Sequence, residues 1–323
     1  MSVKNIIKFV CGAAAALGAA AGAAEPPLAA SIAPLHSLLA GVAVEDDNVI
    51  LVIPPADSPH TARLSPSQAR ALHGAAAVFY IGEHFETFLR GALDSLPPAV
   101  HRVPVARGIT LLPARGVHAD DEHGAHEKEN GEHDEHGGEH EKAHEHEEEH
   151  AAGAKDFHLW LDPQRARHIV RQMAQTLAEI RPARRAEYEA NARRLDEKLT
   201  ALDAALAEML SGARGRYAAA HDAYQYFEHR YGLMPAVAPG GHGGKTSARR
   251  LQDARRAAAK HNIRCLFAEP QTPPRMLAAF TENAQMEIVV VSPLGAGLPP
   301  GKDLYFNLMQ NMGRAFARCL TAP

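Results

Sequence analysis

Short apolar segments that alternate with helical patterns constrain the fold of this chain more than any other sequence feature. Four such runs span residues 49–53, 77–81, 263–267 and 286–291. Runs that are nearly all apolar are typical of strands buried on both faces of a parallel sheet. Helical patterns follow at 66–73 and 273–283. Repeated strand and helix predicts right-handed crossovers and a doubly wound α/β architecture with parallel sheets.

The length of 323 residues favours two lobes over one. A long helical pattern, opening at Pro182 and ending before Gly212, lies between the expected lobes at 25–181 and 212–323. Its apolar stripe consists of Leu195, Leu199, Leu202, Leu206 and Leu210. We expect a single rod of about 28 residues, on the order of 40 Å long, at 182–211. A rigid connection of this kind limits hinge opening between the lobes.

The first 24 residues have the pattern of a secretory signal. Lys4 and Lys8 precede an Ala-rich apolar run, and small residues at 21–24 offer a cleavage site before Glu25. No later apolar run is long enough to span a membrane. We therefore expect a mature chain without a membrane span, exported to the periplasm.

Residues 118–150 form a segment of low complexity that cannot build a core. It contains nine His, with fourteen Asp or Glu against two Lys, a net charge of −12, whereas the whole chain carries −4. The histidines are His118, His123, His126, His133, His136, His140, His144, His146 and His150. Dense imidazole in a solvated loop is suited to several weak Zn, Cu or Ni sites. Metal capture or sensing is one interpretation, and a solvated spacer is the other.

Two motif matches carry little weight. The segments 140–144 and 146–150 fit the H-E-x-x-H pattern of zinc peptidases, but no apolar face there would dock the helix that this chemistry needs. Residues 239–246 end like a phosphate-binding loop but have Pro239 in place of the first Gly. A flexible loop is the preferred interpretation, with His242 as a possible accessory metal ligand.

Two cysteines remain once the signal that contains Cys11 is removed. Cys265 and Cys319 form an even pair in an exported chain, which suggests a disulfide. A disulfide between them would close a loop of 54 residues. In the chain-entropy model, this would contribute about 4 kcal/mol to stability. Two buried free thiols are the alternative.

Three isolated histidines stand where an open α/β sheet holds its ligand. His60 lies beyond the run at 49–53, His221 ends the run at 217–220, and His158 immediately precedes a helical pattern. Ligands bind at the carboxyl ends of parallel strands, and two facing lobes create a cleft there. Each histidine alone is more typical of capping or packing, but together they can converge on a metal ion.

The chain resembles the metal-binding solute-binding proteins of ABC importers, and within them the zinc-uptake type known as the ZnuA family. The similarity covers nearly the whole mature chain. The motifs that carry it are Ser58-Pro59-His60, His158-Leu159-Trp160-Leu161-Asp162-Pro163, His221-Asp222-Ala223-Tyr224, Phe267-Ala268-Glu269-Pro270-Gln271, Pro293-Leu294-Gly295 and the late Cys319.

This resemblance implies one zinc site formed by His60, His158 and His221, a disulfide between Cys265 and Cys319, and delivery to a membrane permease. Many relatives have Asp where this chain has Ser292, and some have Glu where it has Pro59. The fourth ligand is therefore open: water, a histidine of the 118–150 segment, or Glu83.

We predict a monomer that captures Zn²⁺ with high affinity and passes it to an ABC importer, without enzymatic activity or nucleic-acid binding. Three neutral imidazoles favour Zn²⁺ over the harder Mn²⁺. The alternatives are a periplasmic zinc buffer or metallochaperone and a manganese-binding relative. A zinc hydrolase would need a general base beside the metal, and the sequence offers no convincing one.

Overall fold

The structure, a computed structural model, describes residues 25–115, 154–239, 247–282 and 284–321. The expected signal peptide, the nine histidines of residues 118–150 and His242 lie outside the described residues.

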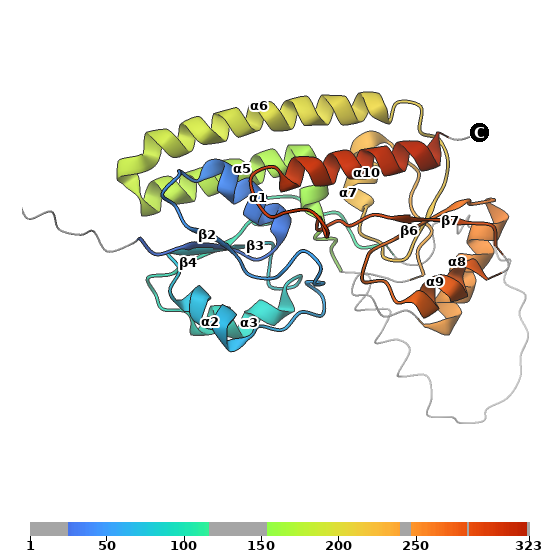
Figure 1. Cartoon of the computed structure of the whole chain (residues 1–323), viewed down its shortest axis with the longest axis horizontal. Helices are drawn as coiled ribbons and strands as arrows, with labels where there is room; N and C mark the ends of the chain where they lie inside the picture. Colours follow the sequence, from blue (N-terminus) through green and yellow to red (C-terminus); the bar gives the residue numbers. More distant parts are fainter. Residues whose placement is uncertain (1–24, 116–153, 240–246, 283, 322–323) are drawn as a thin grey trace, which may run out of the picture.

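The N-terminal half is a four-stranded parallel sheet in the order β2-β1-β3-β4. Its strands are β1 (Leu28–Ala30), β2 (Val49–Leu51), β3 (Ala77–Tyr80) and β4 (His101–Pro104). Its helices are α1 (Ala33–Val42), α2 (Pro66–His73) and α3 (Arg90–Ser95). Figure 1 shows α1 on one face of this sheet and α2 and α3 on the other. Two-sided cover of a parallel sheet is the doubly wound arrangement.

The C-terminal half is a three-stranded parallel sheet in the order β5-β6-β7. Its strands are β5 (Ala218–Ala219), β6 (Cys265–Ala268) and β7 (Glu287–Val290). Its helices are α7 (Gln225–Tyr231), α8 (Ala248–Lys260) and α9 (Pro274–Thr281), and the chain closes with α10 (Leu304–Leu320). The α/β class with parallel sheets is therefore confirmed.

The expectation of strands buried on both faces is wrong for two of the four runs. Strand β2 is only half-buried. In β7, Ile288 and Val290 are 42% and 66% exposed, because β7 is an edge strand of its sheet. The apolar runs locate strands correctly but do not report which strand lies at an edge.

Helix α6 (Arg185–Met209) is the long rod expected from the leucine stripe, and a 3₁₀ turn at Pro182–Arg184 joins it to α5 (Pro163–Ile180). All five leucines of the stripe are buried. A Cβ at Gly41 of α1 would lie 2.9 Å from Leu195, and one at Gly313 of α10 would lie 2.4 Å from Leu206. Glycine therefore lets α6 approach a helix of the N-terminal half and the last helix of the chain, and α6 extends across both halves (Figure 1).

A hydrophobic core runs through both halves, from Leu28 to Leu320, and a smaller second cluster around Ala254 and Phe280 lies within the C-terminal half. Cys265 and Cys319 form a disulfide with Cα atoms 6.1 Å apart, which ties β6 to α10 and confirms the predicted pairing. A core shared between the sheets agrees with a stiff connection, because separating the halves would expose apolar side chains to water.

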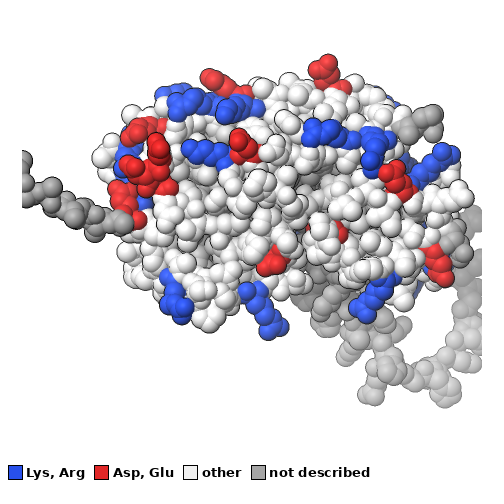
Figure 2. Space-filling view, viewed as in Figure 1, with Lys and Arg blue, Asp and Glu red and all other residues white. Residues whose placement is uncertain are grey.

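The charged groups on the surface are mixed over the long helices. Figure 2 shows acidic and basic side chains next to one another along the side of the molecule that α6 forms. Within the described residues, every helix is too short or too polar to cross a bilayer.

Candidate metal centre

Three chain segments far apart in sequence bring the expected histidines together. His60 follows β2 on the loop that leads to α2, and its backbone N–H donates to Ser58 Oγ at 3.3 Å. His158 immediately precedes a 3₁₀ turn at Leu159–Leu161 and is 2% exposed. His221 follows β5, where the Ala220 N–H is held by the Phe267 carbonyl at 2.8 Å. Two of the three therefore lie just beyond the carboxyl ends of strands.

The three side chains converge closely enough to hold one metal ion. One nitrogen from each ring lies within 4.8 Å of the other two. The ring centroids are 5.6 Å apart for His60 and His158, 5.3 Å for His60 and His221, and 5.0 Å for His158 and His221. Zn–N bonds are about 2.0–2.1 Å long, so two nitrogens on one zinc ion lie at most about 4.2 Å apart. Where the ring nitrogens stand farther apart than this, zinc binding would draw them together around the ion.

A buried carboxylate holds the His158 ring. Asp156 Oδ1 lies 2.8 Å from His158 Nδ1 and also accepts the His158 backbone N–H at 2.8 Å. A carboxylate accepts the hydrogen bond that Nδ1–H donates, so the lone pair of the neutral imidazole is on Nε2. Asp156 is not among the site residues predicted from the sequence, although an acid two residues before a candidate ligand is a usable signal.

A second carboxylate plays the same part for His221. Glu269 Oε1 lies 2.5 Å from His221 Nδ1, and Glu269 follows β6 directly. His221 Nε2 is buried and has no hydrogen-bond partner among the described residues. Burial lowers the pKa of His221, but the hydrogen bond and charge of Glu269 outweigh it, so that this pKa is raised above its ordinary value. Glu269 was predicted only as part of a family motif, although a carboxylate at the end of a strand is a candidate site residue.

The cavity between the rings is small and has mainly apolar walls. Its volume is about 10 Å³, and the side chains that close it include Phe85, Trp160, Pro293 and Leu294. Trp160 donates through Nε1 to the Pro293 carbonyl at 2.8 Å, which fixes this wall. Such a space holds one ion or one water molecule.

Within the part of the chain that the structure describes, no further predicted ligand reaches the rings. Glu83 is exposed on the loop after β3. Ser292 uses its Oγ to accept the N–H groups of Leu294 and Ala296 at 3.3 and 3.0 Å. Among the described residues, Glu269 is the one carboxylate that lines the cavity.

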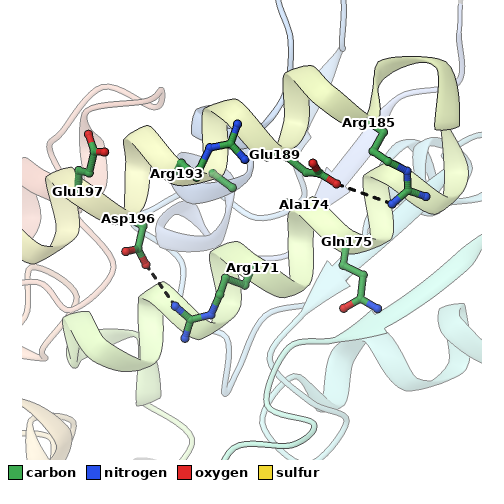
Figure 3. Close-up of a pocket in the computed structure, with 9 residues that line it drawn as sticks. Arg171, Ala174, Gln175, Arg185, Glu189, Arg193, Asp196 and Glu197 are labelled. Carbon is green, nitrogen blue, oxygen red and sulfur yellow. Dashed lines mark hydrogen bonds and ion pairs between the residues drawn. The ribbon is translucent and has the colours of Figure 1, made fainter.

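A larger groove, which shares no lining residue with this cavity, lies between α5 and α6. It has a volume of about 500 Å³ and is lined by three arginines and three carboxylates. Figure 3 shows Arg171 bound to Asp196 and Arg185 bound to Glu189 along this groove. Its positive and negative charges balance, and none of its residues belongs to the cluster of possible metal ligands found among the described residues.

The comparisons with known proteins agree with this geometry. A family model described as "Zinc-uptake complex component A periplasmic" (ZnuA) matches residues 28–319. A high-affinity zinc uptake system protein ZnuA of Brucella suis biovar 1 (strain 1330) is 34% identical over 309 residues, which cover 90% of each chain. The protein of the same name from Paracoccus denitrificans (strain Pd 1222) is 33% identical over 328 residues, covering 96% of this chain and 97% of that one.

Solved structures support the fold. A crystal structure of ZnuA aligns with a TM-score of 0.74 at 22% identity, covering 91% of this chain and 98% of that one. The Pseudomonas aeruginosa solute-binding protein FpvC, in complex with Mn²⁺, aligns with a TM-score of 0.73 at 18% identity, covering 92% and 98%.

The match of the family model over nearly all of the described chain, together with the identity to the Brucella and Paracoccus proteins, shows that this chain belongs to the ZnuA family of periplasmic zinc-uptake components.

Proposed function

We propose that this protein captures Zn²⁺ in the periplasm with His60, His158 and His221 and delivers it to the membrane permease of an ABC importer. The observation that carries the proposal is the convergence of three imidazoles within 4.8 Å in a cavity of about 10 Å³. The names of the Brucella and Paracoccus relatives support the role in uptake.

The donor set favours zinc over manganese. Neutral imidazole nitrogen suits Zn²⁺, whereas Mn²⁺ prefers carboxylate and carbonyl oxygen. The two carboxylates near the rings, Asp156 and Glu269, engage Nδ1 atoms. They place negative charge behind the imidazole rings, so that the atoms in direct contact with the ion are nitrogens. We propose that neither is a direct ligand, so that the fourth tetrahedral position is left to water.

The cavity favours binding over catalysis. A hydrolase needs space for its substrate beside the metal-bound water, and ligand pockets typically have volumes of about 300 Å³ or more. The space here admits a single ion. A solute-binding role therefore accounts for the site without a chemical step.

Zinc binding can be tested with the full chain. Trp160 lies beside His158, so its fluorescence reports on the metal centre. This tryptophan is the one in the sequence, and its ring centroid lies 5.2 Å from that of His158. We expect zinc to change its fluorescence with one tight equivalent. The triple variant His60→Ala, His158→Ala, His221→Ala should lose this equivalent, and retention of a tight one-to-one site in it would refute the assignment.

Delivery is tested by zinc uptake in cells that lack the protein. Restored uptake at limiting zinc by the wild-type gene, and not by the triple variant, supports the importer role. Unchanged uptake in the deletion strain would favour a periplasmic buffer instead.

A further inference from the structure

Two short segments flank residues 116–153 in the sequence and pair with each other. Residues 112–115 and 154–156, here called the neck, run antiparallel through a bridge between Pro113 and Lys155. The Ala114 N–H donates to the Ala154 carbonyl and the Asp156 N–H to the Leu112 carbonyl, both at 2.9 Å. The neck therefore fixes the residues that precede His158.

The neck is attached to α7 of the C-terminal half through a buried tyrosine. Tyr226 Oη accepts the Leu112 N–H at 3.0 Å and donates to the Asp156 carbonyl at 2.7 Å. Tyr226 is fully buried. Because both strands of the neck bond to the same hydroxyl, the neck and α7 form one unit.

Arg115, the last described residue on its side of the neck, makes a second and charged attachment. Its Nε donates to Asp222 Oδ2 at 3.2 Å and its Nη1 to Glu228 Oε2 at 2.5 Å, while Nη2 pairs with Asp222 Oδ1. The side chains of Asp222 and Glu228 are 6% and 3% exposed. Tyr217 and the Ala236 N–H also donate to Glu228. A bidentate guanidinium between two buried carboxylates is geometrically specific, and its loss leaves them uncompensated.

This network reaches two of the three histidines. Asp222 directly follows His221 in sequence, and Asp156 of the neck binds His158 Nδ1. We propose that Arg115 is a positioning residue for the metal centre: by holding Asp222 against the neck, it keeps His221 in register with His158. The inference rests on the zinc-binding function proposed above and extends it to a residue outside the cavity.

The chain offers a matched control for this inference. Arg165 is 21% exposed, against 20% for Arg115, and it likewise pairs with a buried carboxylate, Asp162. Arg165 also lies over the Tyr226 ring at 4.7 Å. It therefore shares the burial, the ion pair and the contact with α7, but it does not bind a residue adjacent to His221.

The experiment compares Arg115→Gln with Arg165→Gln in the full chain. Zinc affinity is measured by competition with a chelator and followed by Trp160 fluorescence, and Co²⁺ serves as a spectroscopic probe of ligand geometry. We expect Arg115→Gln to raise the zinc dissociation constant roughly tenfold and to shift the Co²⁺ visible bands, since loss of outer partners typically costs 10–100-fold in affinity. Arg165→Gln should lower the melting temperature but leave both readouts as in the wild type.

If Arg115→Gln does not fold, Arg115→Lys and Asp222→Asn provide the test instead. Lysine keeps the charge but lacks the planar fork, so we expect it to restore the fold and only part of the affinity. The inference is overturned if Arg115→Gln, or Asp222→Asn where the former does not fold, binds zinc and Co²⁺ as the wild type does. It is equally overturned if Arg165→Gln weakens zinc binding as much. Failure of wild-type protein to bind zinc through the three histidines would instead refute the proposed function.

Discussion

The metal centre and the groove between α5 and α6 are both concave, but they differ in volume and in how their polar groups are used. The groove is about fifty times larger by volume, at about 500 Å³ against about 10 Å³. Its ion pairs include Arg171 with Asp196 and Arg185 with Glu189. In the metal centre, by contrast, carboxylates bind Nδ1 of His158 and of His221. The comparison teaches that converging donors, rather than cavity size, mark the functional site.

The strongest test of this contrast is the replacement of Glu269, the carboxylate that binds His221 Nδ1. Glu269→Gln keeps the size of the side chain but removes the negative charge beside His221 Nδ1, so we expect the zinc dissociation constant to rise by roughly 10- to 100-fold. The matched variant in the groove is Glu197→Gln, which should leave zinc affinity unchanged. Both are measured by chelator competition. Equal effects of the two variants would remove the distinction between the two sites.

The same contrast separates what sequence can predict from what it cannot. Helix α2 was predicted at its observed bounds because its signals are local: Ser65 accepts the Gln68 N–H, and the Gln68 side chain accepts the Ser65 N–H. The convergence of the three histidines was predictable in part, because ligands bind beyond the carboxyl ends of parallel strands and His60 and His221 each follow a strand. The two strands belong to different sheets and His158 follows no strand, so the contact among all three rings depends on how the two halves pack.

Other features depend on contacts between distant segments. Strand β1 is three residues long and Ala-rich, and periodicity cannot distinguish such a run from a helix. The pairing of Glu269 with His221 spans 48 residues, and that of Arg115 with Asp222 spans 107. No local pattern in either segment specifies these partners, so the pairing of Glu269 with His221 and the role of the neck emerge only from the folded structure.

The pH dependence of zinc binding sharpens the comparison further. Burial lowers the pKa of His221, while the hydrogen bond with Glu269 and the charges of Glu269, Asp222 and Asp156 raise it. The resulting pKa lies above the ordinary value of 6.5. In the zinc-free protein this shift stabilises the fold below pH 6.5, and the contribution is lost as pH rises through the raised pKa. Zinc competes with the same proton, so affinity should fall as pH drops through the raised pKa, by no more than about tenfold per pH unit for one proton.

Zinc titrations from about pH 8 to about pH 5.5 test this expectation. The fall should begin at lower pH in Glu269→Gln, because the variant lacks the charge that favours the imidazolium form of His221. An onset at the same pH in both proteins would show that Glu269 does not control this proton.

The smallest effect is expected in the groove itself. Arg171 is 59% exposed and Asp196 is 27% exposed, and the N–O distance between them is 3.2 Å. Arg167 also binds Asp196, so the carboxylate keeps a partner when Arg171 is replaced. Arg171→Gln should therefore lower the free energy of unfolding by about 0.5 kcal/mol or less, since solvent screens exposed ion pairs. Urea unfolding measures this change, and zinc affinity should remain that of the wild type. A loss of zinc affinity in Arg171→Gln would mean that the groove communicates with the metal centre, because no atom of Arg171 lines the cavity that holds the three histidines.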